Sequence, residues 1–273
     1  MYIKKAAYAI IAFVSLAASS LSLAYPLNMT PLPDEPNFPN VVKVVYRADM
    51  TTPEDAARMG GLFARGVNLE TPSDEDLDTS LYRHADGINT GTSHNASGYV
   101  GTTTSLGLAR RWVNDNLNHN GYVYYIASSA NFIPVNDVLR VHSPHPWELE
   151  YAAMRQIRYD QILGWRRSTS EIGPFIPNPA YRAALFNSPT HPAQVDGDND
   201  PLLALAGFDA NSLWWGESPW VNFATCEHRS SCSPKQSNEH AAQDYWKKYR
   251  EEQQAGARKK VAIFHRSYNF GLG

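Results

Sequence analysis

A series of short apolar segments, which do not alternate regularly with helices, limits the folds open to this chain. These segments occupy residues 41–45, 98–100, 122–127, 137–141 and 161–165. Their β-branched and aromatic residues are typical of strands. Strong helix signals are few: Thr52, Pro53 and Gly60 cap, start and end one short helix, and Ser105 caps another. Many strands with few helices predict an α+β domain.

Two more helices are expected. Residues 73–85 have acidic side chains in their first turn and Gly87 just beyond their end. Residues 239–258 contain no proline and are rich in Ala, Gln, Glu and Lys, which predicts a mostly solvated helix. Between residues 173 and 226, prolines, asparagines and aromatic residues predict an irregular segment that wraps the domain.

The N-terminal residues have the pattern of a secretory signal peptide. Lys4 and Lys5 precede a short apolar run, and Ser22 and Ala24 occupy the positions that signal peptidase reads. We therefore expect residues 1–24 to be removed and the mature chain to be secreted. No stretch approaches the roughly 20 apolar residues that a transmembrane helix needs. Residues 25–40 include five prolines and predict an extended leader over the surface.

Charge and cysteine content narrow the class of protein further. The formal net charge is −3 with 43% hydrophobic residues, which is ordinary for a globular protein and not basic enough for general nucleic-acid binding. Cys226 and Cys232 lie close together, and export to an oxidising compartment predicts a disulfide between them. So small a loop contributes little loop-closure entropy. Holding two pieces together after a cut is one reason for such a bridge.

Glu148 and Glu150 are the first candidates for catalysis. If this segment is extended, the two carboxylates share one face about 7 Å apart, and Leu149 faces the other way. One carboxylate can then stay ionised against a developing positive charge, while the other, its pKa raised by its neighbour, handles a proton. A bare Glu-x-Glu is by itself a weak motif, and a solvated polar face on an edge strand is its ordinary explanation.

Arg47, His84 and a run of hydroxyl residues are the other candidates. Arg47 follows the segment 41–45, and its planar fork of donors suits a phosphate, although a pair with Asp49 is the alternative. His84 is either a catalytic or a structural histidine. In the run 101–105, Ser105 is expected to cap a helix. The preceding threonines either favour a strand through their β propensity or hydrogen-bond a neighbouring carboxylate.

Taken in order, these residues resemble the A subunits of the cholera toxin and heat-labile enterotoxin family, which belongs to the Arg–Ser–Glu class of ADP-ribosyltransferases. The first matching block is Tyr46-Arg-Ala-Asp49, Thr52-Pro-Glu, Gly60-Gly-Leu62 and Arg65-Gly66. The second is Leu81-Tyr-Arg-His-Ala85, Gly87, Thr90-Gly91 and Gly98-Tyr-Val100. The third is Val135-Asn-Asp-Val-Leu139, Ser143-Pro-His-Pro146, Glu148-Leu-Glu150 and Gln161-Ile-Leu-Gly-Trp165. The resemblance implies a mixed two-sheet ADP-ribosyltransferase fold with an extended C-terminal helix.

The resemblance also implies a reaction, in which ADP-ribose moves from NAD to an arginine of a host protein, and it implies no metal. Arg47 would anchor an NAD phosphate. Glu150 would stabilise the oxocarbenium-like transition state, and Glu148 would orient and deprotonate the incoming guanidinium. His84 would hydrogen-bond the ribose or the backbone around it. The family's usual target is a heterotrimeric G protein α subunit.

One position departs from the family pattern. Where the family has Ser-Thr-Ser after Gly-Tyr-Val, this chain has Gly101, Thr102 and Thr103, so the first hydroxyl is missing. The two threonines remain candidates for holding Glu150. The departure leaves a catalytically inactive relative, kept for binding, as an alternative function.

The resemblance divides the rest of the chain. Residues 25–225 would form the catalytic domain, and residues 226–232 would be a nicking loop with Arg229 as a trypsin-like site. Residues 233–273 would be a helical tail that passes through a pentamer of receptor-binding B subunits. A lid over the cleft is expected between residues 62 and 79. The proline-rich leader, which those toxins lack, motivates a stand-alone NAD glycohydrolase or transferase as a second alternative.

Overall fold

The computed structural model of the chain describes residues 32, 34–68, 77–87, 95–187, 201–228 and 231–268. Some of the predicted features lie outside these residues. They are the signal peptide at residues 1–24, the cleavage site at Arg229, and residues 69–76 of the expected lid. Within the described residues, no helix is both long enough and apolar enough to cross a membrane.

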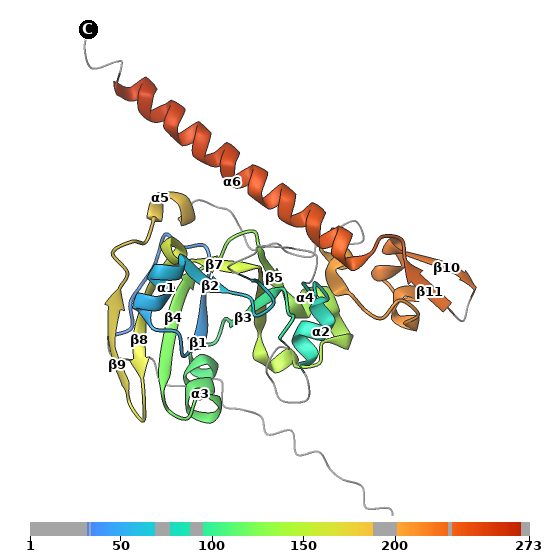
Figure 1. The fold of residues 1–273 in the computed structure, drawn as a ribbon, viewed down its shortest axis with the longest axis horizontal. Coiled ribbons are helices and arrows are strands. Elements are labelled where there is room, and N and C mark those ends of the chain that lie inside the picture. The colour runs from blue at the N-terminus through green and yellow to red at the C-terminus, as the bar shows by residue number, and fades with distance from the viewer. Residues whose placement is uncertain are drawn as a thin grey trace, which may run out of the picture.

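The centre of the fold is a seven-stranded sheet in which each pair of neighbouring strands is antiparallel. In spatial order its strands are β5 (Phe132–Pro134), β6 (Glu150–Met154), β3 (Tyr99–Thr103), β1 (Val44–Asp49), β4 (Gly121–Ala127), β8 (Ile162–Ser168) and β9 (Ile172–Pro177). Two small sheets pair β2 (Gly61–Phe63) with β7 (Gln156–Arg158), and β10 (Ala224–His228) with β11 (Ser231–Pro234). The predicted α+β class is confirmed (Figure 1).

Short helices surround this sheet, and one long helix leaves it (Figure 1). The α-helices are α1 (Pro53–Met59), α2 (Leu81–Asp86), α3 (Leu106–Asn116), α4 (Val135–Leu139), α5 (Ala183–Phe186) and α6 (Asn238–Tyr268). The 3₁₀ turns are η1 (Arg140–His142), η2 (Pro146–Glu148), η3 (Tyr159–Gln161), η5 (Pro201–Ala206), η6 (Leu213–Gly216) and η7 (Trp220–Phe223).

The helices with clear capping signals form where the sequence predicts them. The hydroxyl of Thr52 accepts a hydrogen bond from the Asp55 amide, and Gly60 ends α1 with φ of 85°, a conformation that favours glycine. Ser105 caps α3 in the same way, through the Leu108 amide. Both boundaries follow from interactions within a few residues along the chain.

Some of the predicted helices and strands differ from the structure. Residues 137–141 do not form a strand: α4 and η1 lie there, because Val135, Val138 and Leu139 bury one helical face. The predicted helix at 73–85 begins only at Leu81, where Ser80 caps α2. The first strand runs over Val44–Asp49 rather than 41–45, so Arg47 lies within β1 instead of beyond its end.

The N-terminal leader packs against the domain rather than only passing over its surface. Phe38 and Val41 contact the apolar cluster between α3 and the sheet. The guanidinium of Arg166, whose side chain is 1% exposed, donates to a carboxylate oxygen of Asp34 at 2.9 Å and lies 3.7 Å from Glu35. Buried guanidinium groups need such partners. The leader is therefore attached to the sheet through both apolar and ionic contacts.

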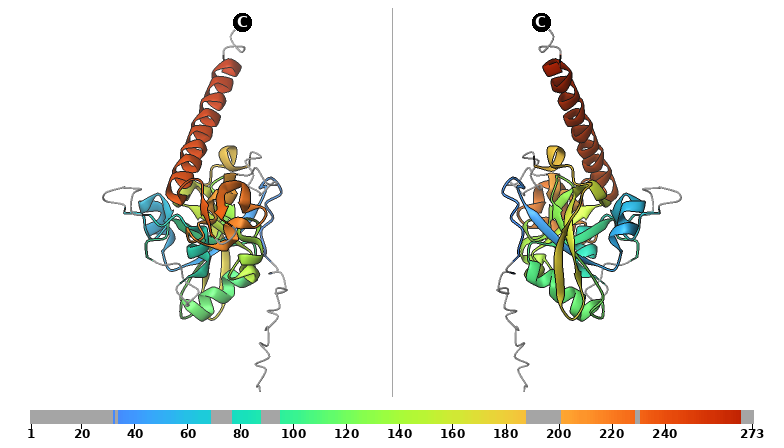
Figure 2. Two further views of the ribbon diagram at one scale, coloured as in Figure 1. Left: turned by 90° about the vertical axis from the view of Figure 1, so that its right-hand side faces the viewer. Right: turned by 90° about the vertical axis from the view of Figure 1, so that its left-hand side faces the viewer.

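The C-terminal helix α6 differs from the prediction of a mostly solvated helix. Its 31 residues span about 46 Å, and Ala241, Ala242, Trp246 and Tyr249 from its first turns are buried in the largest core cluster. The remainder projects away from the domain, as both views of Figure 2 show. The predicted disulfide between Cys226 and Cys232 is present and closes the β10–β11 hairpin just before this helix.

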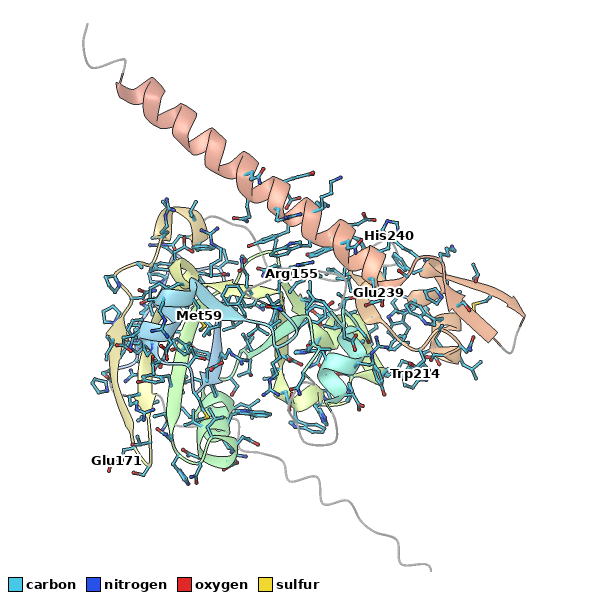
Figure 3. All side chains as sticks on the ribbon, in the orientation of Figure 1. Met59, Arg155, Glu171, Trp214, Glu239 and His240 are labelled. Carbon is cyan, nitrogen blue, oxygen red and sulfur yellow. A yellow bond between two sulfur atoms is a disulfide. The ribbon has the colours of Figure 1, made fainter. Side chains whose placement is uncertain are left out.

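Replacing Trp246 by alanine is expected to lower the free energy of unfolding by about 3 kcal/mol, because it leaves a cavity in the core. The matched control is His240→Ala on the same helix, at an exposed position labelled in Figure 3, where we expect a change below about 0.5 kcal/mol. Urea denaturation of both variants measures the difference. Equal stabilities would show that α6 is not part of the core.

Candidate active site

All six residues that the sequence singled out line one pocket of about 360 Å³. They are Arg47 from β1, His84 from α2, Thr102 and Thr103 from β3, Glu148 from η2, and Glu150 from β6. The pocket lies where α2 and α3 meet strands β1 and β3. Residues that are up to 103 positions apart in the sequence are thus brought together by the pairing of β1, β3 and β6.

Arg47 is held firmly at the floor of the pocket. Its Nε atom donates to Asp49 at 2.7 Å, and its Nη1 atom donates to the carbonyl of Gly101 at 2.7 Å. Burial raises the pKa of Asp49, but the charge of Arg47 and hydrogen bonds from Thr51 outweigh burial and lower it. The pair with Asp49 and a role in the pocket are therefore compatible, since the side chain is still a quarter exposed.

His84 connects α2 to Glu150. Its Nε2 atom lies 3.0 Å from Oε1 of Glu150, and its Nδ1 atom lies 2.7 Å from the hydroxyl of Ser97. The side chain of His84 is only 2% exposed, and that of Glu150 is 12% exposed. The imidazole thus fixes the position of one carboxylate oxygen of Glu150, a residue that lines the pocket.

The segment from Glu148 to Glu150 is not extended, so the condition under which its two carboxylates would share one face of a strand does not hold. Glu148 ends the turn η2, Leu149 has a left-handed conformation with φ of 49°, and Glu150 begins β6. Because Leu149 reverses the local backbone, both carboxylates still line the same pocket. Burial, and then the nearby charge of Glu150, raise the pKa of Glu148 to about 8.

The hydroxyl run on β3 contacts backbone groups. Thr102 donates to the carbonyl of Tyr151 at 2.6 Å, and Thr103 accepts from the Ser105 amide at 3.0 Å. The contact to Glu150 comes from His84 instead. The threonines therefore secure β3 against its neighbouring strand and the start of α3.

Several pocket residues were not singled out by the sequence. Phe63, Tyr99 and Trp112 add aromatic surface from β2, β3 and α3. Ser97 does not line the pocket but contacts His84, and it is fully buried. Trp112 carries a signal only as a member of an amphipathic helix. Ser97 carries no local signal, because its contact with His84 depends on how α2 packs against the start of β3.

Comparison with known proteins places the chain in a family. A model of the heat-labile enterotoxin alpha chain family matches residues 36–272. The chain belongs to this family. The resemblance drawn from its motifs is thereby confirmed, and it extends through the disulfide-closed hairpin into α6.

Individual enterotoxin A chains are similar over most of their length. The A chain of heat-labile enterotoxin IIB from Escherichia coli is 36% identical over 202 residues, which are 72% of this chain and 73% of that protein. The corresponding chain of cholera enterotoxin from Vibrio cholerae is 31% identical over 223 residues, covering 80% and 84%. A solved heat-labile enterotoxin double mutant has a TM-score of 0.62 at 29% identity, and the match covers 81% of this chain and 95% of that one.

Membership of the enterotoxin family assigns the general chemistry. The chain is an ADP-ribosyltransferase of the toxin class, and NAD is its substrate. The pocket contains a guanidinium group, a carboxyl group held by His84, and a second carboxyl group whose pKa is raised to about 8. Within the described residues, no group of three or more acidic, histidine or cysteine side chains is arranged to hold a metal ion.

Proposed function

We propose that this protein transfers ADP-ribose from NAD to an arginine side chain of a host protein. The observation that carries the proposal is the pair of glutamates in one pocket, one tied to His84 and the other with a pKa raised to about 8. One carboxylate stays available for the sugar, and the other is suited to a proton transfer. The relative named NAD(+)--arginine ADP-ribosyltransferase, 34% identical over 66% of this chain, supports the choice of arginine.

In the proposed reaction, the bond between the nicotinamide nitrogen and the ribose C1′ breaks, and nicotinamide leaves with the electron pair. The carboxylate of Glu150 stabilises the positive charge that develops on the ribose. Arg47 binds a phosphate of NAD and holds the sugar in reach. His84 orients Glu150 through the hydrogen bond between Nε2 and Oε1. Thr102 and Thr103 keep β3, which lines the NAD site, in place.

Glu148 acts on the arginine acceptor. A nitrogen of the guanidinium forms the new bond to C1′, and the proton that it loses passes to the carboxylate of Glu148. A protonated guanidinium is a poor nucleophile, so this transfer is required for reaction. Burial near Glu150 raises the pKa of Glu148, and the approach of a cationic acceptor favours its ionised form, so the base is generated where it is needed.

We propose that the N-terminal and C-terminal segments of the chain serve to export the protein and to carry its catalytic domain to a host cell. We infer that residues 1–24 direct secretion, that residues 25–225 form the catalytic domain, and that a protease cuts at Arg229 between the two cysteines. Residues 233–273 then form a tail whose projecting helix inserts into a pentamer of B subunits (Figure 2). After uptake into a host cell, the acceptor is a G protein α subunit. The assembly is tested by whether a B pentamer co-purifies with the full chain and is lost when residues 255–273 are deleted.

The decisive experiment measures NAD turnover by the trypsin-nicked, reduced protein, with and without agmatine as an arginine mimic. Formation of ADP-ribosyl-agmatine supports the proposal, and release of nicotinamide without transfer supports the alternative of a stand-alone NAD glycohydrolase. That alternative is motivated by the leader, which packs on the domain through Phe38 and Arg166. A folded protein that cleaves no NAD would be the inactive relative.

A further inference from the structure

A chain of three hydrogen-bonding groups ends at Glu150. The Ser97 hydroxyl lies 2.7 Å from Nδ1 of His84, and Nε2 of the same imidazole lies 3.0 Å from Oε1 of Glu150. Ser97 is fully buried, and His84 is nearly so. Buried polar groups strongly favour a single hydrogen-bonding pattern, because a buried donor or acceptor without a partner lowers the stability of the fold.

The backbone around Ser97 holds its hydroxyl in place. The Ser97 carbonyl accepts from the Gly66 amide at 2.9 Å, and Ser97 forms a β-bridge with Asp78, just before α2. Its hydroxyl oxygen also accepts a hydrogen bond from the Tyr99 amide at 3.2 Å. The hydroxyl proton is then free to be donated to Nδ1 of His84. In this arrangement a neutral imidazole carries its proton on Nε2, which is the nitrogen facing Glu150.

Gly101 leaves the space that the Glu150 carboxylate occupies. A Cβ atom at position 101 would lie 2.7 Å from Oε1 of Glu150 and 3.7 Å from Nε2 of His84. Real Cβ atoms do not approach oxygen that closely, so the carboxylate, which ends a flexible side chain, would have to shift to accommodate any side chain at this position. Gly101 therefore leaves the carboxylate room for the position that it takes beside His84.

We propose that Ser97 is a positioning residue for NAD cleavage, which fixes His84 with its proton on Nε2 so that the imidazole donates to Glu150, and that Gly101 makes room for this contact. The inference rests on the proposed function of the pocket. In this proposal the Ser97 hydroxyl holds Glu150 indirectly, through the imidazole of His84. In the family pattern, a hydroxyl at position 101 is expected instead. Ser97 touches neither NAD nor the acceptor in this scheme.

The test is a double-mutant cycle on the nicked, reduced full chain, with initial rates of nicotinamide release as the readout. Ser97→Ala is expected to lower kcat about tenfold and to change KM less than about twofold. The substitution leaves Nδ1 of the buried His84 imidazole without its hydroxyl partner, so Glu150, which acts in the transition state, is held less firmly. Ser129→Ala removes another fully buried hydroxyl, outside the pocket, and is the matched control with an expected kcat near that of the wild type.

Substitutions at position 101 complete the cycle. Either side chain shifts the carboxylate of Glu150 relative to His84. Gly101→Ser supplies a hydroxyl that can hold the shifted carboxylate and Gly101→Ala supplies none, so the alanine variant is expected to be about tenfold slower than the serine variant. In the Gly101→Ser background, adding Ser97→Ala is expected to cost less than about twofold. The same tenfold loss in both backgrounds would overturn the proposal, as would a Ser97→Ala variant with the wild-type kcat.

A second measurement does not depend on activity. The ¹⁵N chemical shifts of the His84 imidazole report which nitrogen carries the proton, and we expect the Nε2–H tautomer in the wild type and a loss of that preference in Ser97→Ala. A wild type with the Nδ1–H tautomer would overturn the proposal. If the expected shifts are seen in a protein that cleaves no NAD, the hydrogen-bond chain stands and the proposed function of the pocket fails.

Discussion

Replacing Glu150 by glutamine is expected to lower the rate of NAD cleavage about 10³-fold. Glutamine keeps the size of the side chain and an oxygen that can accept from His84 at 3.0 Å, so the geometry is preserved and only the negative charge is lost. That charge faces the positive charge developing on the ribose, and removal of one such preorganised group typically costs this much. Release of nicotinamide from NAD, in the absence of acceptor, measures the effect directly.

The control for Glu150→Gln is the same substitution at Glu171. This glutamate is exposed in the turn between β8 and β9, at the lower edge of the sheet in Figure 3 and outside the pocket. Glu171→Gln is expected to cleave NAD at the wild-type rate. A Glu150→Gln variant that retains a tenth or more of the wild-type rate would contradict the role given to this carboxylate.

Replacing Glu148 by glutamine is expected to separate transfer from hydrolysis. Transfer to agmatine should fall about 10²-fold, because the guanidinium loses the base that accepts its proton. Hydrolysis of NAD by water should fall much less, because Glu150 and Arg47 still act on the sugar and the phosphates. The ratio of ADP-ribosyl-agmatine to free ADP-ribose measures the separation. Equal losses of both products would place Glu148 in the cleavage step instead.

The pH dependence follows from the same carboxyl group. With a pKa raised to about 8, Glu148 is protonated at lower pH and becomes a base only as the pH rises through that value. Transfer by the wild type should therefore increase up to about pH 8 and level off above it, while Glu148→Gln lacks this rise. A pH profile of transfer that is identical in both proteins would exclude Glu148 as the titrating group.

The raised pKa of Glu148 affects stability in the opposite direction to activity: transfer increases with pH, whereas the free energy of unfolding decreases. Between its ordinary pKa of 4.5 and about 8, Glu148 holds a proton in the folded state that the unfolded chain has already released. The free energy of unfolding then falls as the pH rises through this window, because the unfolded state binds fewer protons. The Glu148→Gln variant should lose less stability than the wild type between pH 5 and pH 8 in thermal denaturation.

Local signals in the sequence were sufficient to predict where some helices of this fold begin. The helices α1 and α3 begin at Thr52 and Ser105 because capping depends on residues three positions away. The members of the pocket were also recognisable, since their order along the chain resembles that of a known family. The predicted strand at 137–141 failed because Val135, Val138 and Leu139 fit a helical face as well as a strand, and packing decides between them.

The geometry within the pocket was beyond the reach of the sequence. The left-handed conformation of Leu149 redirects the chain between the two glutamates, and a β-branched or apolar pattern gives no sign of it. The contact of Ser97 with His84 joins the segment before β3 to α2, and the space at Gly101 is filled by a side chain from β6. Each of these depends on the mutual placement of elements that are far apart along the chain.

The burial of the first turns of α6 has a consequence for the proposed cleavage between Cys226 and Cys232. If the backbone is cut there and the disulfide is reduced, Trp246 and Tyr249 still hold the tail through their contacts in the core. Departure of the tail requires both rings to leave their apolar surroundings, and such a step has a steep temperature dependence. A nicked and reduced molecule therefore keeps its tail for a finite time, and temperature rather than the concentration of reductant determines that time.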